Sequence, residues 1–323
     1  MAFYRGDYVK VKQKFEQRRV DARNRMEERR KEVCAAIPEL KEICGLLDDT
    51  GPRVYQAALE GKAGFEEKLA AIRRQNDALL QRQSELLVKN GYPADYLDVK
   101  YECPLCRDEG NIDGRMCGCM KAELAFLGFE TAGIAALRRK MNFGSFDLSY
   151  YKDGDRKNME VVLRRIKEYA ENFHGKGSGS LLFIGGMGLG KTHLSVALTE
   201  KVVENGYYAV YCTAENLFSD FRYERFRRED DKTDSKTDRY YDCELLVIDD
   251  LGTELGGRDI TPFLYNLLNV RINSGLSTVI NTNLSHNEMM ARYDERIASR
   301  LLGEFLPYRF TGKDVRMQKL QQM

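Results

Sequence analysis

The sequence has no long apolar run and almost no net charge. No stretch approaches the roughly 18 apolar residues that a membrane-spanning helix needs, and residues 1–14 are charged rather than apolar as in a signal peptide. We therefore expect a cytoplasmic protein. The chain has 51 Lys and Arg residues against 50 Asp and Glu residues. No strongly basic field covers the whole molecule, so any nucleic-acid surface must be local.

The first third of the chain predicts helices. Residues 8–89 are rich in Glu, Lys, Arg, Gln, Leu and Ala, and apolar residues such as Leu69 and Ile72 recur at helical spacing. Pro38 and the Asp-Asp-Thr-Gly-Pro stretch at 48–52 interrupt this pattern, which predicts two or three helices rather than one long coiled coil. These helices form either a hairpin that packs on itself or an arm that binds a partner.

The second half of the chain alternates between apolar strands and amphipathic helices. This alternation predicts a parallel sheet with right-handed crossover connections. The expected strands are residues 180–186, 208–214, 244–251, 277–284 and 306–311. The expected helices begin near Lys191, Glu215, Ile260 and His286. The charge-rich insertion at 227–238 lacks apolar periodicity and predicts a mobile loop.

A glycine-rich loop follows the first expected strand. It matches the Gly-x4-Gly-Lys-Thr pattern of a Walker A phosphate loop, between an apolar strand and a helix as that motif requires. Backbone N–H groups of such a loop surround phosphate oxygens, and the helix N-terminus favours negative charge. We expect Lys191 to reach the β- and γ-phosphates of ATP and the Thr192 hydroxyl to bind Mg²⁺. The candidate nucleotide-binding residues here are Gly185, Gly186, Met187, Gly188, Leu189, Gly190, Lys191, Thr192 and His193.

Two consecutive acids end another expected strand. Residues 245–248 read Leu-Leu-Val-Ile and are followed by Asp249 and Asp250, which is a Walker B pattern. We expect Asp249 to hold Mg²⁺, directly or through water, and Asp250 to orient and deprotonate the attacking water. Two acids here favour a hydrolytic ATPase over a simple kinase, with Glu254 as a second candidate for the base. The alternative is a strand-terminal turn without a catalytic role.

The remaining motifs resemble a known family. The strand at 277–284 ends in polar residues and is similar to the sensor 1 strand of AAA+ ATPases, with Asn283 as the sensor. The run from Gly185 to Arg316 contains Gly-Lys-Thr-His, Ile-Asp-Asp-Leu-Gly, Asn-Thr-Asn-Leu, Glu-Arg-Ile-Ala-Ser-Arg-Leu and Gly-Lys-Asp-Val-Arg. Together these segments resemble the DnaC/DnaI helicase loaders and the related IstB transposition helpers, over roughly the C-terminal half of the chain.

The resemblance implies roles for two arginines. It implies that Arg300 is the finger that reaches a neighbouring subunit's γ-phosphate, and that Arg316 is the sensor 2 arginine at the nucleotide. Few residues follow Arg316, so we expect no C-terminal helical lid and ATP sites that are completed by self-association. The alternative is a surface arginine paired with Glu295 or Glu304.

Four of the eight cysteines cluster in the sequence. Cys103 and Cys106 form a C-x2-C pair, and Cys117 and Cys119 form a C-x-C pair shortly after it. Four thiolates complete the tetrahedral coordination of a structural Zn²⁺ ion, so we expect zinc here. Redox dithiol chemistry, unliganded core cysteines and an Fe–S cluster are the alternatives. Some DnaI-type loaders carry a zinc-binding N-terminal domain, so zinc favours a loader over a transposition helper.

One expected helix interleaves aromatic and basic side chains. Binding of single-stranded DNA needs cations along the phosphates and aromatic rings that stack on bases, and the resemblance implies a DNA-contacting insertion at residues 216–228. The candidates are Phe221, Arg222, Arg225 and Arg227. The alternative is a helix that buries its Phe stripe and leaves its arginines in solvent.

The sequence thus predicts an α/β protein with an AAA+ P-loop core and a five-stranded parallel sheet. The expected divisions are a helical partner-binding region at 1–100, a four-cysteine module at 101–122, a connector at 123–150 and an ATPase domain at 151–323. The expected cofactors are ATP, Mg²⁺ and structural Zn²⁺. The expected function is to load a hexameric replicative helicase on single-stranded DNA. The alternatives are an IstB-like transposition helper and a nucleotide-latched adaptor with little hydrolysis.

Overall fold

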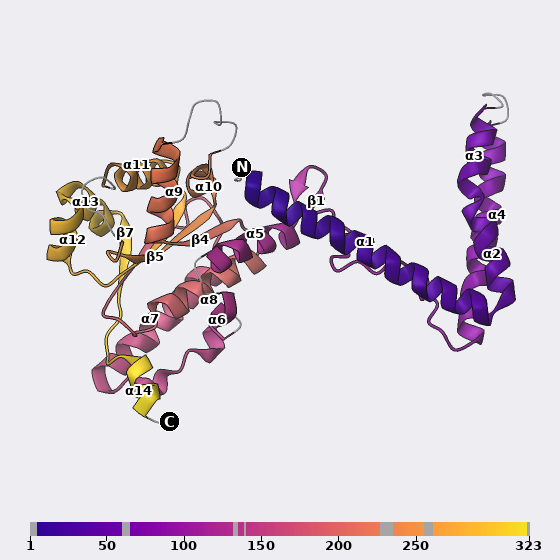
Figure 1. The fold of residues 1–323 in the computed structure, drawn as a ribbon. Coiled ribbons are helices and arrows are strands. Elements are labelled where there is room, and N and C mark those ends of the chain that lie inside the picture. Colours follow the sequence, from indigo (N-terminus) through magenta and orange to yellow (C-terminus); the bar gives the residue numbers. More distant parts are fainter. Residues whose placement is uncertain are drawn as a thin grey trace. The chain divides into compact units, whose positions relative to one another are not determined.

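The computed structural model describes residues 5–59, 65–131, 135–138, 140–226, 235–254 and 261–321. The chain forms two compact units, one of residues 14–109 and the other of residues 1–13 and 110–323 (Figure 1). Within the described ranges, no helix has the length and apolar character to span a membrane.

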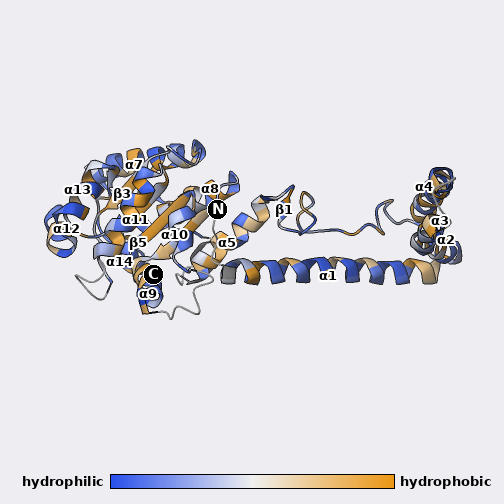
Figure 2. Ribbon diagram, turned by 90° about the horizontal axis from the view of Figure 1, so that it is seen from above, coloured by the Kyte–Doolittle hydropathy of each residue, from blue (hydrophilic) through white to orange (hydrophobic). Residues whose placement is uncertain are grey.

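The unit of residues 14–109 is helical. Its described helices are most of α1 (Arg5–Ala36), α2 (Pro38–Asp48), α3 (Thr50–Leu59) and α4 (Phe65–Lys89). The prediction of two or three helices was too low, because the described residues of this region form four. Pro38 begins α2, where proline is tolerated, and only Asp49 separates α2 from α3. Figure 2 shows that α1 is hydrophilic over much of its length. The end of α1 packs with α2 and α4 around Val33, Ile37, Leu40, Ile43, Leu86 and Leu87.

The other unit contains a five-stranded parallel sheet, as predicted. Its strands are β3 (Ser180–Ile184), β4 (Ala209–Thr213), β5 (Leu245–Leu251), β6 (Ser277–Thr282) and β7 (Phe305–Arg309). The order across the sheet is β4-β5-β6-β3-β7, and every neighbouring pair is parallel. The carboxyl ends of β3, β5 and β6 therefore lie along one edge, where parallel α/β sheets bind ligands.

Helices cover both faces of this sheet (Figure 1). They are α5 (Gly118–Thr131), α7 (Asp153–Glu171), α8 (Lys191–Glu204), α9 (Ala214–Phe226), α10 (Asp238–Asp242), α11 (Thr261–Asn273), α12 (His286–Tyr293) and α13 (Glu295–Gly303). The large core lies between the sheet and α5, α7 and α8, and it includes Phe183, Leu194, Val247 and Val279. The strands match the predicted ones within about two residues, since apolar runs flanked by turn residues mark strand positions well.

Several short elements fall outside the predicted ones. A two-stranded hairpin, β1 (Asn111–Ile112) and β2 (Arg115–Met116), lies within the cysteine module. The connector contains α6 (Ala135–Arg138) and the 3₁₀ turns η1 (Phe143–Ser145) and η2 (Leu148–Tyr150). The predicted loop at 227–238 contains the start of α10, and its residues 227–234, including the DNA candidate Arg227, lie outside the described residues. Among the described residues, α14 (Val315–Gln321) is the one helix after β7.

Candidate nucleotide-binding site

The phosphate loop connects β3 to α8. Gly190 caps α8 with a left-handed backbone (φ 86°), a conformation that favours glycine. Lys191 is 7% exposed, and its Nζ donates hydrogen bonds to the carbonyl oxygens of Gly185 and Gly186, both at 2.7 Å. Burial lowers the pKa of Lys191, while the charges of the Walker B acids oppose that shift. The Lys191 ammonium group thus lies within the phosphate loop, where we expect it to contact the phosphates of ATP.

The loop also contacts the C-terminal helix α14. The backbone N–H of Val315 donates to the carbonyl of Gly188 at 3.0 Å, and Asp314 Oδ1 accepts from the N–H groups of Arg316 and Met317. Gly188 has φ 71°, and a Cβ atom there would overlap the Asp314 carboxylate. Glycine is therefore required by both the backbone conformation and the space.

Gly188→Ala is expected to lower the free energy of unfolding of the nucleotide-free protein by about 1–3 kcal/mol, the usual cost of a strained backbone. Gly186→Ala is the control, because its Cβ would make only an ordinary contact of 3.7 Å with Leu189 Cδ1. Chemical denaturation of both variants provides the comparison. Equal destabilisation would contradict this account of Gly188.

Asp249 is the hub of a buried hydrogen-bond network. Asp249 is 3% exposed and lies near the carboxyl end of β5. The Thr192 hydroxyl donates to it at 3.0 Å to Oδ2, the Tyr211 hydroxyl at 2.5 Å to Oδ2, and Asn281 Nδ2 at 2.6 Å to Oδ1. Burial and the Asp249 charge raise the pKa of Tyr211, so the phenol stays protonated and donates. Tyr211 and Asn281 were not predicted as site residues, because each lies within an apolar strand whose sequence resembles ordinary core.

Asp250 differs from its neighbour in exposure and backbone conformation. It is exposed at the edge of the sheet and has a positive φ of 56°, next to an irregularity in the pairing of β5 with β6. Surrounding protein atoms raise the pKa of Asp250 by desolvation, and the Asp249 charge raises it further. A carboxyl group with a raised pKa in a cleft is typical of general bases.

A cavity of about 260 Å³ lies over the phosphate loop. Among the predicted residues, its lining includes Met187 to His193, Asp250, Asn283 and Arg316. Thr253 and Lys319 also line it. Asn283 follows the end of β6 and is exposed, whereas Asn281, within β6, is fully buried. The structure thus brings the loop, one acid, the sensor candidate and one of the two arginines to a single cavity.

The connector supplies an aromatic wall that sequence analysis did not predict. Phe146, Tyr150 and Tyr151 line the cavity, and the Tyr151 hydroxyl donates to the carbonyl of Leu189 at 3.0 Å. The His193 ring meets Phe146 edge-on, with centroids 5.2 Å apart. Apolar and aromatic walls with a few polar groups are typical of small-ligand sites. Aromatic residues cluster at 143–151 in the sequence, and this cluster could have indicated the wall, but the segment was predicted to be a connector.

Two candidates lie away from this cavity. Arg300 is not among the described residues that line it; its Nη2 donates to the Tyr265 hydroxyl at 3.1 Å, and its guanidinium lies over the Tyr265 ring. Glu254 is 3% exposed and accepts from Arg292 Nε at 3.0 Å and from the N–H of Gly252 at 2.8 Å. This engagement in structural contacts argues against Glu254 as the second candidate for the base.

The four clustered cysteines come together in the structure. Their Sγ atoms all lie within 4.8 Å of one another, and a tetrahedral zinc site with bonds of about 2.3 Å places its sulfurs roughly 3.8 Å apart. The hairpin turn at Asp113 and Gly114 has positive φ at both residues, and the buried Asp108 carboxylate accepts from the N–H of Cys103 at 2.8 Å. The donor set therefore fits Zn²⁺.

Helix α9 buries the aromatic face that was expected to contact DNA. Phe221 is 5% exposed and stacks on Phe263, with centroids 5.3 Å apart, so the prediction that its ring is available to a base was wrong. Leu217 and Phe218 share this buried face. The exposed aromatics are instead Tyr223 and Phe226, which are 52% and 80% exposed.

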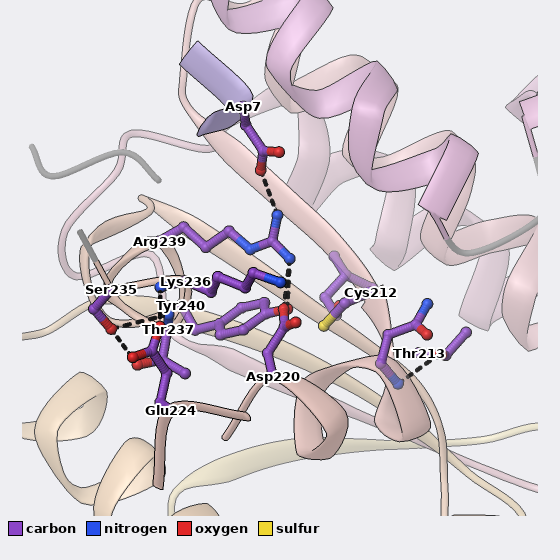
Figure 3. Close-up of polar contacts among 12 residues, drawn as sticks. Asp7, Cys212, Thr213, Asp220, Glu224, Ser235, Lys236, Thr237, Arg239 and Tyr240 are labelled. Atoms are coloured by element: carbon purple, nitrogen blue, oxygen red, sulfur yellow. Dashed lines mark hydrogen bonds and ion pairs between the residues drawn. The ribbon is translucent and has the colours of Figure 1, made fainter. Parts of the chain in front are cut away.

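The two arginines of α9 that the structure describes lie at its surface. Arg222 Nη2 forms an ion pair with Glu215 at 3.0 Å, and the Arg225 guanidinium lies 5.9 Å from the centroid of Phe226. Arg239 of α10 forms ion pairs with Asp220 of α9 at 2.7 Å and with Asp7 at 2.5 Å (Figure 3). Helix α9 presents cations and aromatic rings together on its outer side.

Comparisons with known proteins identify a family and several relatives. Residues 130–307, more than half of the chain, match the family model described as IstB-like ATP binding protein. A curated relative, the replicative helicase loader DnaC of Buchnera aphidicola subsp. Baizongia pistaciae, is 27% identical over 171 residues, which cover 53% of this chain and 66% of the relative. DnaC of Escherichia coli strain K12 is 23% identical over 173 residues, covering 54% of this chain and 67% of the relative.

Among solved structures, the DnaC helicase loader crystal structure is similar at a TM-score of 0.45 and 22% identity, over 54% of this chain and 99% of that one. The family model begins within the connector, at residue 130, and spans the phosphate loop, both acids and Arg300. The chain belongs to the family of IstB-like ATP binding proteins.

Proposed function

We propose that this chain is an ATPase that loads a hexameric replicative helicase on single-stranded DNA. The observation that carries the chemistry is the buried Asp249 bonded to Thr192 of the phosphate loop, with Asp250 exposed to the cavity beside it. The loading role is supported by the curated relatives named as replicative helicase loaders. An IstB-like transposition helper is the second candidate, because the family model that matches is described as IstB-like ATP binding protein.

In the proposed hydrolysis, different residues of the site bind the phosphates, bind the metal ion and accept the proton. Lys191 exchanges its two carbonyl acceptors for the β- and γ-phosphates, and the loop N–H groups bind the remaining oxygens. The Thr192 hydroxyl and the Asp249 carboxylate would hold Mg²⁺, which favours such oxygen ligands and would supply positive charge to the phosphates. Asp250 accepts a proton from the attacking water, while Asn283 orients that water or the γ-phosphate. Phe146 and Tyr151 would contact the adenine ring of ATP.

Two arginines complete the site from different subunits in this proposal. Arg316 lines the cavity of its own chain, which suits a sensor of the bound nucleotide. Arg300 lies on α13 beside Tyr265, and we assign it to the cavity of a neighbouring copy. Self-association is then required for fast turnover, because a positioned arginine stabilises the charge of the transition state.

Mixing two inactive variants tests the assignment of Arg300. Arg300→Ala keeps its phosphate loop, and Lys191→Ala keeps its finger, so a mixed assembly contains sites with both groups intact. We expect each variant alone to hydrolyse ATP at least about 100-fold more slowly than wild type, and the mixture to recover a measurable part of the rate. No recovery at any ratio would show that Arg300 does not act between subunits.

DNA binding is proposed for the outer side of α9. Replacing Tyr223 and Phe226 together by alanine is expected to weaken single-stranded DNA binding, since stacking contributes about 1–3 kcal/mol per base. Phe221→Ala is the contrasting variant, and it should lower stability by about 3–5 kcal/mol as a buried aromatic does. Fluorescence anisotropy with an oligonucleotide measures the first effect and thermal unfolding the second. Unchanged anisotropy in the double variant would exclude this face.

Mass measurement of the full chain separates the candidate functions. A loader should form a stable complex with the hexameric helicase in the presence of ATP and single-stranded DNA, with residues 1–100 and the zinc module as the proposed contact. A transposition helper should instead assemble on duplex DNA and leave the helicase uncomplexed. A nucleotide-latched adaptor would bind its partner without measurable phosphate release.

A further inference from the structure

The Asp249 carboxylate accepts hydrogen bonds from four different residues. Besides Thr192, Tyr211 and Asn281, the backbone N–H of Asp250 donates to Oδ1 at 3.1 Å. A metal-binding carboxylate needs lone pairs that point at the ion, and the donors around it fix where the remaining lone pairs point. The donors therefore determine how well Asp249 serves as a ligand.

The orientation of the Asn281 amide is fixed by its partner. A carboxylate only accepts hydrogen bonds, so the amide nitrogen rather than the oxygen must face Asp249. The same nitrogen donates to Ser195 Oγ at 2.8 Å, and Ser195 Oγ donates to the carbonyl of Lys191 at 3.0 Å. Asn281 thus joins β6 and the first turn of α8 to the carboxylate.

Tyr211 approaches the same carboxylate from β4. Its ring is 1% exposed and packs on Phe129 of α5, with centroids 5.1 Å apart. Gly128 of α5 lies so close that a Cβ atom there would be 2.6 Å from the carbonyl oxygen of Tyr211. The ring and the backbone of Tyr211 are both held by packing, so its hydroxyl has a fixed position.

We propose that Tyr211 and Asn281 are positioning residues that hold the Asp249 carboxylate beside the Thr192 hydroxyl, so that both oxygens meet the Mg²⁺ of Mg-ATP. The inference rests on the proposed ATPase function and adds two residues to it. Thr192, Tyr211 and Asn281 come from α8, β4 and β6, which flank β5 on three sides. A substitution that removes the donor of Tyr211 or of Asn281 therefore leaves the donors on the other two elements unchanged.

Tyr211→Phe is the most direct test, because it removes one hydroxyl and keeps the packed ring. Binding of a fluorescent ATP analogue is measured against Mg²⁺ concentration and, separately, in EDTA. We expect the half-saturating Mg²⁺ concentration to rise about tenfold or more, in the range usual for the loss of an outer-shell partner of a metal ligand, with metal-free binding unchanged. Tyr308→Phe is the matched control, since it removes a buried phenol hydroxyl on β7, where the ring packs on Phe183.

Asn281→Leu and an Asp249→Ala background complete the experiment. Asn281→Leu should raise the Mg²⁺ requirement in the same way, and Tyr211→Phe should add nothing once Asp249 is alanine. A shift no larger than that of Tyr308→Phe, or an equal loss of metal-free binding, would overturn the positioning role while leaving the ATPase proposal intact. A wild-type protein whose nucleotide binding ignores Mg²⁺ would overturn both.

Discussion

Replacing Asp250 by asparagine is expected to slow ATP hydrolysis by about 10²–10⁴-fold, the usual contribution of a general base, without loss of ATP binding. The amide keeps the size of the side chain but no longer accepts a proton from water. Nucleotide binding should persist, because the loop contacts of Lys191 and the Asp249 network do not involve the Asp250 carboxylate. Phosphate release under single-turnover conditions and binding of a fluorescent ATP analogue measure the two quantities.

Glu254→Gln provides the comparison for Asp250. Glu254 accepts from Gly252, Arg292 and Tyr293, so its substitution should lower the melting temperature while hydrolysis is retained. A slow Glu254→Gln variant together with a fast Asp250→Asn variant would reverse the assignment of the base. The two variants thus distinguish the catalytic carboxylate of Asp250 from the structural carboxylate of Glu254, four residues further along the chain.

Cys106→Ser is expected to release bound zinc and to unfold the cysteine module. The Cys106 side chain is 5% exposed and its Sγ belongs to the four-sulfur cluster. Structural zinc sites contribute apparent binding energies of about 10–16 kcal/mol at neutral pH, which couple directly to folding. Elemental analysis should find one zinc per wild-type chain and a large loss in the variant, and circular dichroism should report lost structure.

Cys34→Ser is the control for this experiment, because Cys34 lies on α1 and outside the cluster. It should retain the full zinc content. Wild-type protein that contains iron or no metal at all would contradict the zinc assignment, and a Cys106→Ser variant with unchanged metal content would exclude Cys106 as a ligand.

The sheet and the phosphate loop were predictable because their signals are local. Apolar runs at 181–184 and 245–248 define buried strands, and glycine and lysine spacing defines the loop without knowledge of the rest of the fold. The aromatic face of α9 was predicted wrongly, since Phe221 and Phe226 look alike in the sequence. Their exposure of 5% and 80% depends on which side of the helix meets the sheet and α11.

The rest of the site depends on contacts between distant segments. Tyr211 and Asn281 reach Asp249 across 38 and 32 residues of sequence, and each resembles a core residue by its neighbours. Phe146 and Tyr151 meet the phosphate loop only because the connector folds back over it. Pairings of this kind follow from tertiary packing, which strand and helix periodicity does not determine.

The close packing of Gly128 on Tyr211 makes α5 a shared element of two sites. The first turn of α5 carries Cys119, and its last turn presses on the strand whose tyrosine holds Asp249. Close-packed interiors transmit small displacements, because there is no free volume to absorb them. If the proposed Mg-ATP site is correct, we expect a ligand that displaces α5 at its cysteine end to change the affinity for Mg-ATP, and by thermodynamic reciprocity Mg-ATP should change the affinity for that ligand by the same factor.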